Sequence, residues 1–312
     1  MRVLIIRFSS IGDILLCTPV IRCLSKQRQA NITFMTGEKF KNLLSGNPYI
    51  DRIVTDSEGL MTTRKWIQDQ NFDLIVDLHK NRISILLTLG LKAKLIRYDK
   101  LNVKKWWYVL TKKNVLPDKH LVDRYFDALR NENINNDGLG LDFSLNRDAI
   151  VNDLPSHYNV IVLGAAHKTK RIPENIVSQW VQRSSLPVVL IGGADVVNEG
   201  KSLAGGLTEK VINATGQLSI DESAYVLSRA EKILTGDTGM MHLSAALKKS
   251  VIVLWGNTTP AFGMYPYYGN QPVGWQSKEV HNLACRPCSK LGFQECPKGH
   301  FKCMMLQKAE DW

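Results

Sequence analysis

Short apolar runs alternate with amphipathic stretches along the whole chain, which is the pattern of an α/β protein with parallel strands. In the first half we expect strands at residues 2–6, 32–35, 50–54 and 74–77, with helical stretches between them. The pattern then restarts, with strands expected at residues 160–163, 188–191, 211–213, 233–234 and 251–254. This repetition predicts two Rossmann-like domains, each with a doubly wound parallel sheet.

Helix signals lie between the expected strands. Asp13 is expected to open a helix that Pro19 kinks slightly, and a second amphipathic helix runs from His120 to Arg130. Residues 219–222 (Ser-Ile-Asp-Glu) form a capping box at the start of another helix.

The poorest region for secondary structure is 131–153, which is dense in Asn, Asp and Gly and has few apolar residues. We interpret it as the connection between two domains, 1–150 and 151–312, the second of which ends in a cysteine-rich tail at 281–305. A chain of 312 residues is long enough for two domains with separate cores.

Composition and charge narrow the class of protein. Apolar residues make up 44% and charged residues 22%, as in soluble globular proteins. The net charge is +11, and residues 92–113 contain eight basic residues, with Trp106, Trp107 and Tyr108 among them. This combination suggests an anionic partner, either a membrane surface or a phosphorylated glycolipid, although a solvated basic face would have the same composition. We expect no nucleic-acid partner, because no nucleic-acid-binding motif accompanies the charge.

The chain also lacks the expected features of a secreted or membrane-spanning protein. Arg7 interrupts the first apolar run, and the most apolar segment, residues 83–91, is far shorter than the roughly 20 residues of a membrane span. We therefore expect a cytoplasmic protein, with peripheral contact to a membrane surface left open.

The most informative stretch is 232–260, which is expected to form a strand, a turn, a helix, a strand and a second turn. The first turn combines Asp237, Thr238 and Gly239, and His242 follows in the first turn of the helix. Free N–H groups at a helix N-terminus attract anions, so this turn is suited to a phosphate or a ribose. In the alternative interpretation, Asp237 and Thr238 only cap the helix and His242 only packs.

Two other loops carry candidate chemistry. Gly12 and Asp13 follow the first strand, where Asp13 would serve either as a general base or as a helix N-cap. The loop lacks Gly-x-Gly-x-x-Gly, which disfavours a nicotinamide or flavin dinucleotide site. Lys168, Lys170 and Arg171 follow the first strand of the second domain and could neutralise a departing diphosphate.

The tail contains Cys285, Cys288, Cys296 and Cys303, and the first pair has zinc-knuckle spacing. In a cytoplasmic protein, the alternatives are a structural Zn²⁺ or free thiols, because disulfides are rare there. A catalytic metal is not expected, since four thiolates leave no open position.

Taken together, these motifs resemble glycosyltransferase family 9, the lipopolysaccharide heptosyltransferases. The resemblance covers nearly the whole chain. In the first half it includes the N-terminal signature at 2–19 and the Asp-Leu-His-Lys-Asn-Arg loop at 77–82. In the second half it includes Lys-Arg-Ile-Pro at 170–173, where Ile172 replaces the family's Trp. It also includes Asp-Thr-Gly-x-x-His at 237–242, which is followed by Gly-x-Thr-x-Pro at 256–260.

The resemblance implies a GT-B fold, in which two Rossmann-like domains face a cleft and the first binds the acceptor. It also implies inverting transfer of heptose from ADP-heptose to the phosphorylated lipid A–core of lipopolysaccharide, at the inner face of the inner membrane and with no cofactor required. It assigns the base to Asp13, while donor binding falls to Gly12, Lys170, Asp237, Thr238, Gly239, His242 and Thr258. Asp195 is a candidate for the ribose or adenine, and Arg82, Lys104, Lys105 and His120 are candidates on the acceptor side.

Three other functions remain as alternatives. The chain could transfer another nucleotide-activated sugar, bind a sugar nucleotide without catalysis, or bind nucleic acid through a zinc-organised tail. A base at Asp13 opposite Lys170 argues against pure binding, and two Rossmann-like halves argue against the nucleic-acid binder.

Overall fold

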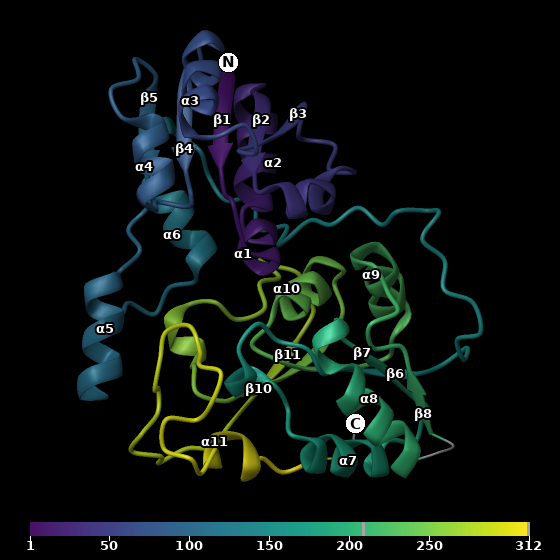
Figure 1. The fold of residues 1–312 in the computed structure, drawn as a ribbon. Helices are drawn as coiled ribbons and strands as arrows, with labels where there is room; N and C mark the ends of the chain where they lie inside the picture. Colours follow the sequence, from purple (N-terminus) through teal and green to yellow (C-terminus); the bar gives the residue numbers. More distant parts are fainter. Residues whose placement is uncertain (208–209, 311–312) are drawn as a thin grey trace. The chain divides into compact units, whose positions relative to one another are not determined.

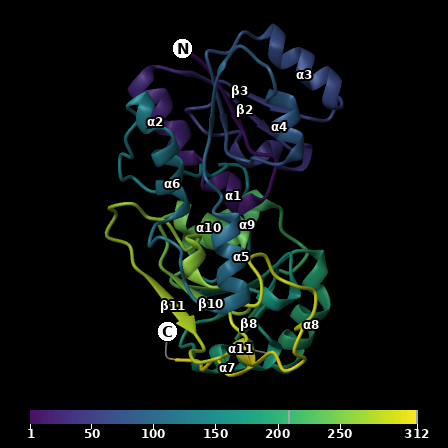
Figure 2. The same cartoon turned by 90° about the vertical axis from the view of Figure 1, so that its left-hand side faces the viewer.

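The computed structural model describes residues 1–207 and 210–310, which form two compact units (Figures 1 and 2). The first unit comprises Met1–Lys100, Lys119–Ser144 and Gly269–Gln271. The second comprises Leu101–Asp118, Leu145–Tyr268 and the chain from Pro272 onward. Each unit is built on its own parallel sheet with helices, so the predicted α/β class is confirmed. Residues 101–118 group with the second unit, although they lie within the range 1–150.

The first sheet has the order β3-β2-β1-β4-β5, and all of its strand pairs are parallel. Its strands are β1 (Arg2–Ile6), β2 (Asn31–Thr36), β3 (Arg52–Thr55), β4 (Leu74–Asp77) and β5 (Lys94–Arg97). Both faces are covered, because consecutive residues of β1 and β4 are buried whichever way they point. β5 was not anticipated, since it is a short edge strand with a cation at each end.

The helices of the first unit are α1 (Ile11–Leu15), α2 (Thr18–Arg28), α3 (Leu60–Asp69), α4 (Arg82–Thr88) and α6 (Leu121–Ala128). The prediction of a single kinked helix that begins at Asp13 was wrong, because the chain forms two helices, α1 and α2, in this region. Asp13 does not open the first helix but is its third residue. Pro19 has no N–H to bond the carbonyl of Leu15, and the Thr18 hydroxyl donates to that oxygen instead, at 2.7 Å.

Much of the stretch expected to connect the domains packs into the first unit instead. Arg22 of α2 is 1% exposed, and its guanidinium forms ion pairs with Asp137, at 2.7 Å, and with Asp142. Leu141 is fully buried. The polar composition of 131–144 therefore reflects partners for a buried arginine rather than a solvated linker.

The second sheet has the order β11-β10-β9-β6-β7-β8, again with parallel pairs. Its strands are β6 (Asn159–Val162), β7 (Val188–Ile191), β8 (Val211–Asn213), β9 (Ile233–Gly236), β10 (Val251–Trp255) and β11 (Trp275–Glu279). Counted from the first strand of the unit, this is the order 3-2-1-4-5-6 of Rossmann folds.

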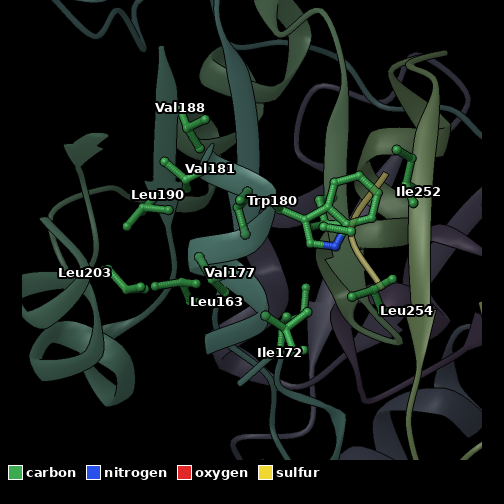
Figure 3. Packing of buried hydrophobic residues seen from close by; sticks show 14 of the residues in the cluster. Leu163, Ile172, Val177, Trp180, Val181, Val188, Leu190, Leu203, Ile252 and Leu254 are labelled. Atoms are coloured by element: carbon green, nitrogen blue, oxygen red, sulfur yellow. The ribbon is translucent and has the colours of Figure 1, made fainter. Parts of the chain in front are cut away.

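One face of the second sheet packs on α7 (Glu174–Arg183) and α8 (Val197–Gly206). Trp180 of α7 is fully buried at the centre of this layer, close to Ile252 and Leu254 of β10 (Figure 3). The alternate residues Val251 and Val253 are also fully buried, on the face toward α9 (Ile220–Arg229) and α10 (Gly239–Ala246). Burial on both faces explains the continuous apolar strands of this half. The remaining helices are α5 (Asn102–Thr111) and α11 (Lys302–Met305).

Candidate functional site

The polar loops of the second unit meet where its strand order reverses. β6 and β9 are neighbours in the sheet, but the chain proceeds from them toward opposite edges. The loops that leave the carboxyl ends of two such strands diverge and create a crevice, which is the usual ligand position in open α/β sheets. The loop after β6 contains Lys170, and the loop after β9 contains Asp237.

These two loops are joined by direct polar contacts. The Lys170 Nζ atom lies 2.7 Å from Oδ2 of Asp237, and the two side chains are 16% and 14% exposed. The Thr258 hydroxyl, from the loop after β10, donates to the same carboxylate oxygen at 2.8 Å. Three loops that are far apart in the sequence therefore converge on one carboxylate.

Two glycines permit this close approach. A Cβ atom at Gly236 would lie 2.1 Å from the carbonyl oxygen of Lys170, and one at Gly256 would lie 2.5 Å from that of Thr169. Any side chain at these positions would displace the 3₁₀ turn Lys168–Lys170 from the strand ends. Gly236 and Gly256 thus permit the Lys170 loop to lie against the strand ends, a role that was not predicted from the sequence.

The N-terminus of α10 lies at the same strand ends. Thr238 is its N-cap, and the Thr238 hydroxyl accepts from the backbone N–H of Met241 at 3.4 Å. Gly239 is the first helical residue, and His242 is 3% exposed. The first-turn N–H groups of a helix have no acceptor within the helix, so this end favours negative charge.

The cysteine-rich tail holds two of these loops in place. The Arg286 side chain donates to the carbonyl oxygens of Gly256 and Thr258, each at 2.7 Å. Farther along, the backbone N–H of Phe293 donates to the Thr169 hydroxyl at 2.8 Å, and the Thr169 N–H donates to the Phe293 carbonyl at 3.1 Å. The tail is therefore part of the scaffold of the Lys170 and Thr258 loops, which the sequence did not indicate.

Asp195 lies on a different loop, the 3₁₀ turn Ala194–Val196 after β7. Its half-exposed carboxylate forms an ion pair with Arg171, which also lies 3.5 Å from Glu199. Arg171 is thus turned toward these acids, whereas Lys170 is turned toward Asp237.

In the first unit, the corresponding strand-order reversal lies between β1 and β4. Asp13 follows β1, and Oδ1 of its carboxylate lies 2.6 Å from a guanidinium nitrogen of Arg7. The Ser10 hydroxyl donates to Asp13 Oδ2 at 3.0 Å. Burial by itself would raise the pKa of Asp13, but the Arg7 charge and the Ser10 hydrogen bonds outweigh burial and lower it. Asp13 is therefore an ionised, oriented carboxylate.

Arg7 also ties the loop after β1 to the loop after β4. It is 6% exposed and donates to the backbone carbonyls of Ser9 and Leu78. The next residue, His79, lies with its ring 5.2 Å from that of Phe8. Burial and the Arg7 charge lower the pKa of His79 to about 4, so the ring is neutral at pH 7. The role of Arg7 was not predicted from the sequence, because a lone arginine beside a turn gives no indication of its partner.

The acceptor-side candidates do not share one element. Arg82 is exposed at the start of α4 in the first unit, whereas Lys104 and Lys105 lie on α5 and group with the second. His120 is 1% exposed, and its Nδ1 atom accepts from the backbone N–H of Val122 at 3.1 Å. This placement gives His120 a structural role as the N-cap of α6.

The four tail cysteines are reduced and differ in environment. Burial raises the pKa of Cys288 to about 11 and that of Cys303 to about 12. Cys285 Sγ lies 3.9 Å from Nε2 of His300. Within residues 1–207 and 210–310, no three His, Cys, Asp or Glu side chains converge in a way that could hold a metal ion. Zinc binding by the four cysteines stays a prediction, and we derive no step through a metal.

Comparisons with known proteins agree with this architecture. Residues 61–294 match the model of glycosyltransferase family 9 (heptosyltransferase). Lipopolysaccharide heptosyltransferase 1 of Pseudomonas aeruginosa is 23% identical, over 93% of this chain and 86% of its own. A shorter match, 32% identical, covers 32% of this chain and only 29% of lipooligosaccharide heptosyltransferase 2 of Campylobacter jejuni.

Solved structures show the same fold. A family 9 glycosyltransferase from Veillonella parvula superposes with a TM-score of 0.75 at 18% identity, covering 97% of this chain and 92% of that one. An E. coli heptosyltransferase in complex with ADP superposes with a TM-score of 0.68 at 22% identity, and the match covers 89% of this chain and 92% of that one. These likenesses identify the two sheets as those of a GT-B heptosyltransferase fold. Among the described residues, no helix is long and apolar enough to cross a membrane.

Proposed function

This chain belongs to glycosyltransferase family 9, and from that premise we propose that it transfers a heptose from ADP-heptose to the inner core of lipopolysaccharide, with inversion. The observation that carries the proposal is the convergence of Lys170, Asp237 and Thr258 at the strand-order reversal of the second unit. A cation beside a helix N-terminus at this point of a Rossmann-like sheet suits the diphosphate of a sugar nucleotide. The E. coli structure with bound ADP supports the choice of nucleotide.

On the donor side, Lys170 is the group that offsets the charge of the diphosphate. The ammonium and the first turn of α10 would neutralise the charge that develops on ADP as the bond to the sugar breaks. Asp237 is itself an anion, so we assign it a positioning role: it holds the Lys170 ammonium at 2.7 Å and the Thr258 hydroxyl at 2.8 Å. Thr238 and Gly239 shape the helix start, and His242 is buried one turn into the helix.

In the transfer step, Asp13 acts as the base. Its carboxylate accepts the proton of the acceptor hydroxyl while that oxygen bonds to the anomeric carbon from the face opposite the nucleotide. The carbon–oxygen bond to the phosphate breaks, and its electron pair leaves with ADP. Inversion follows because a single displacement reverses the configuration at the anomeric carbon. Arg7 and Ser10 keep Asp13 ionised and oriented for this step.

For the acceptor, we propose the phosphorylated lipid A–core. Arg82 is exposed at the start of α4 and is available to a phosphate group. The net charge of +11 also attracts the chain to an acceptor that carries several negative charges.

A product assay tests the proposal. The chain is incubated with a core lipid acceptor and, in parallel, with ADP-heptose, UDP-sugars or GDP-sugars, and the lipid product is analysed by mass spectrometry. We expect a mass increase of one heptose with ADP-heptose alone. Transfer from a UDP- or GDP-sugar instead would show a different donor, and tight ADP-heptose binding without product would show a non-catalytic binding protein.

A further inference from the structure

The helix α5 has an apolar face that the rest of its unit does not cover. Val103, Trp106, Trp107 and Leu110 follow the spacing i, i+3, i+4 and i+7, so they lie along one side of the helix. Their exposed fractions are 80%, 58%, 46% and 61%. None of the ten residues of α5 is buried. Two adjacent exposed tryptophans on one helix face are unusual on a soluble surface and mark an interaction site.

The opposite side of α5 is the one attached to the second unit. The Tyr108 ring packs edge-on against Phe262, with the ring centroids 5.9 Å apart. The Lys112 ammonium donates to the carbonyl of Pro287 at 2.8 Å, and the Lys290 ammonium donates to the side chain of Asn102 at 3.3 Å. These three contacts fix the orientation of α5. The face that carries Trp106 and Trp107 therefore points away from the rest of the second unit.

The charges around this face select its partner. Residues 101–117 contain four lysines and no acid: Lys104, Lys105, Lys112 and Lys113. Both Lys104, beside the apolar face, and Lys113, just after the C-terminal end of the helix, are exposed. Tryptophan prefers the boundary between hydrocarbon and headgroups, and lysines that flank an apolar helix face are attracted to anionic lipids.

We propose that α5 lies in the surface of an anionic lipid bilayer, with Val103, Trp106, Trp107 and Leu110 inserted among the lipid chains. The flanking lysines then contact the headgroup phosphates, while their aliphatic stems extend the apolar surface. A second copy of this chain fits less well, because two such helices would bring their like-charged lysines together. The proposal uses none of the donor-site residues and does not depend on the identity of the sugar.

Vesicle co-sedimentation with the full chain tests the proposal. Vesicles of phosphatidylcholine, with and without phosphatidylglycerol, are compared at low and high salt. We expect binding only to the anionic vesicles, weakened by salt, together with a blue shift of tryptophan emission. The Trp106→Ser/Trp107→Ser variant should bind at least about tenfold more weakly, since it loses the side chains that insert. Lys104→Glu/Lys113→Glu should also weaken binding, through charge reversal.

The matched control is Leu60→Ser/Met61→Ser, which removes two exposed apolar side chains from α3 and should bind as the wild type does. Absence of wild-type binding to anionic vesicles, or equal binding by the tryptophan variant, would overturn the proposal. So would a loss of self-association by the tryptophan variant in sedimentation velocity without a change in vesicle binding, which would identify a second copy as the partner. Calorimetry with ADP separates this result from the proposed function, because the tryptophan variant should bind ADP normally.

Discussion

The Lys170 ammonium lies 2.7 Å from the Asp237 carboxylate, and this ion pair joins the loops that leave β6 and β9. The pair does more than neutralise charge. It directs a flexible lysine side chain to the point where the sheet opens, beside the first turn of α10, and so reduces the conformational entropy that ligand binding would otherwise remove.

Substitution of Lys170 by Ala should weaken ADP binding by about tenfold to a hundredfold, since a charge-assisted hydrogen bond to phosphate is lost. The control is Lys168→Ala, because Lys168 belongs to the same 3₁₀ turn but is exposed. Calorimetry with ADP measures both variants. Equal ADP affinities of Lys170→Ala and Lys168→Ala would show that Lys170 does not bind the diphosphate.

Asp13→Asn should reduce the rate of transfer by about 10²–10⁴-fold, because the amide cannot accept the acceptor proton. Affinity for ADP should stay close to that of the wild type, since the donor cluster belongs to the second unit. Asp69→Asn, on the exposed end of α3, serves as the control and should transfer normally. Wild-type turnover by Asp13→Asn would show that another group is the base.

The pH dependence of transfer should reflect the Arg7 pair. Since Arg7 and Ser10 lower the pKa of Asp13 despite burial, the wild-type base should lose its charge only at a lower pH than an ordinary aspartate does. The pairing stabilises the fold above the unfolded-state pKa, and this contribution is lost as pH falls through the folded-state pKa.

In Arg7→Met, burial would act on Asp13 without the compensating charge, and the pKa of Asp13 should rise. The acid limb of log(kcat/KM) against pH should therefore move to higher pH, with a smaller displacement in Arg7→Lys. An unchanged profile in folded Arg7→Met, verified by circular dichroism, would exclude this electrostatic role.

Gly236→Ala should destabilise the protein by about 1–3 kcal/mol and weaken ADP binding, because its Cβ would lie 2.1 Å from the Lys170 carbonyl. Gly205→Ala is the contrasting variant: Gly205 lies in α8, where an added methyl group would have no atom within 4 Å, and the change should stabilise by about 0.5–1 kcal/mol. Urea unfolding and ADP calorimetry measure the two effects. A Gly236→Ala variant with wild-type stability and affinity would contradict the close-approach explanation.

Metal content decides between the two alternatives for the four tail cysteines, a structural Zn²⁺ or free thiols. Among the described residues, no three His, Cys, Asp or Glu side chains are placed to hold a metal ion, and burial raises the pKa values of Cys288 and Cys303. We therefore expect protein purified without chelator to contain no stoichiometric zinc and to have tail thiols that react with alkylating agents once unfolded. One equivalent of zinc per chain would instead support the four-thiolate site.

Much of this architecture could be predicted from the chain alone. Buried parallel strands appear as continuous apolar runs, and the expected ranges at β1, β4, β7 and β8 coincide with the observed ones. The capping box at Ser219 is also present, with the Ser219 hydroxyl accepting from the N–H of Glu222. Such features depend on residues close in sequence, and local backbone preference is sufficient to specify them.

Only the tertiary structure decided which distant side chains meet. The pairing of Arg7 with Asp13, the burial of Arg22 against Asp137, and the support that Arg286 provides to the Thr258 loop depend on strand order and on loops crossing strand ends. The sequence placed Lys170, Asp237 and Thr258 each at the end of a strand, so their chemistry was apparent. That they share one carboxylate follows from the order in which β6, β9 and β10 pair, because hydrogen bonding between strands, and not distance along the chain, sets which loops are neighbours.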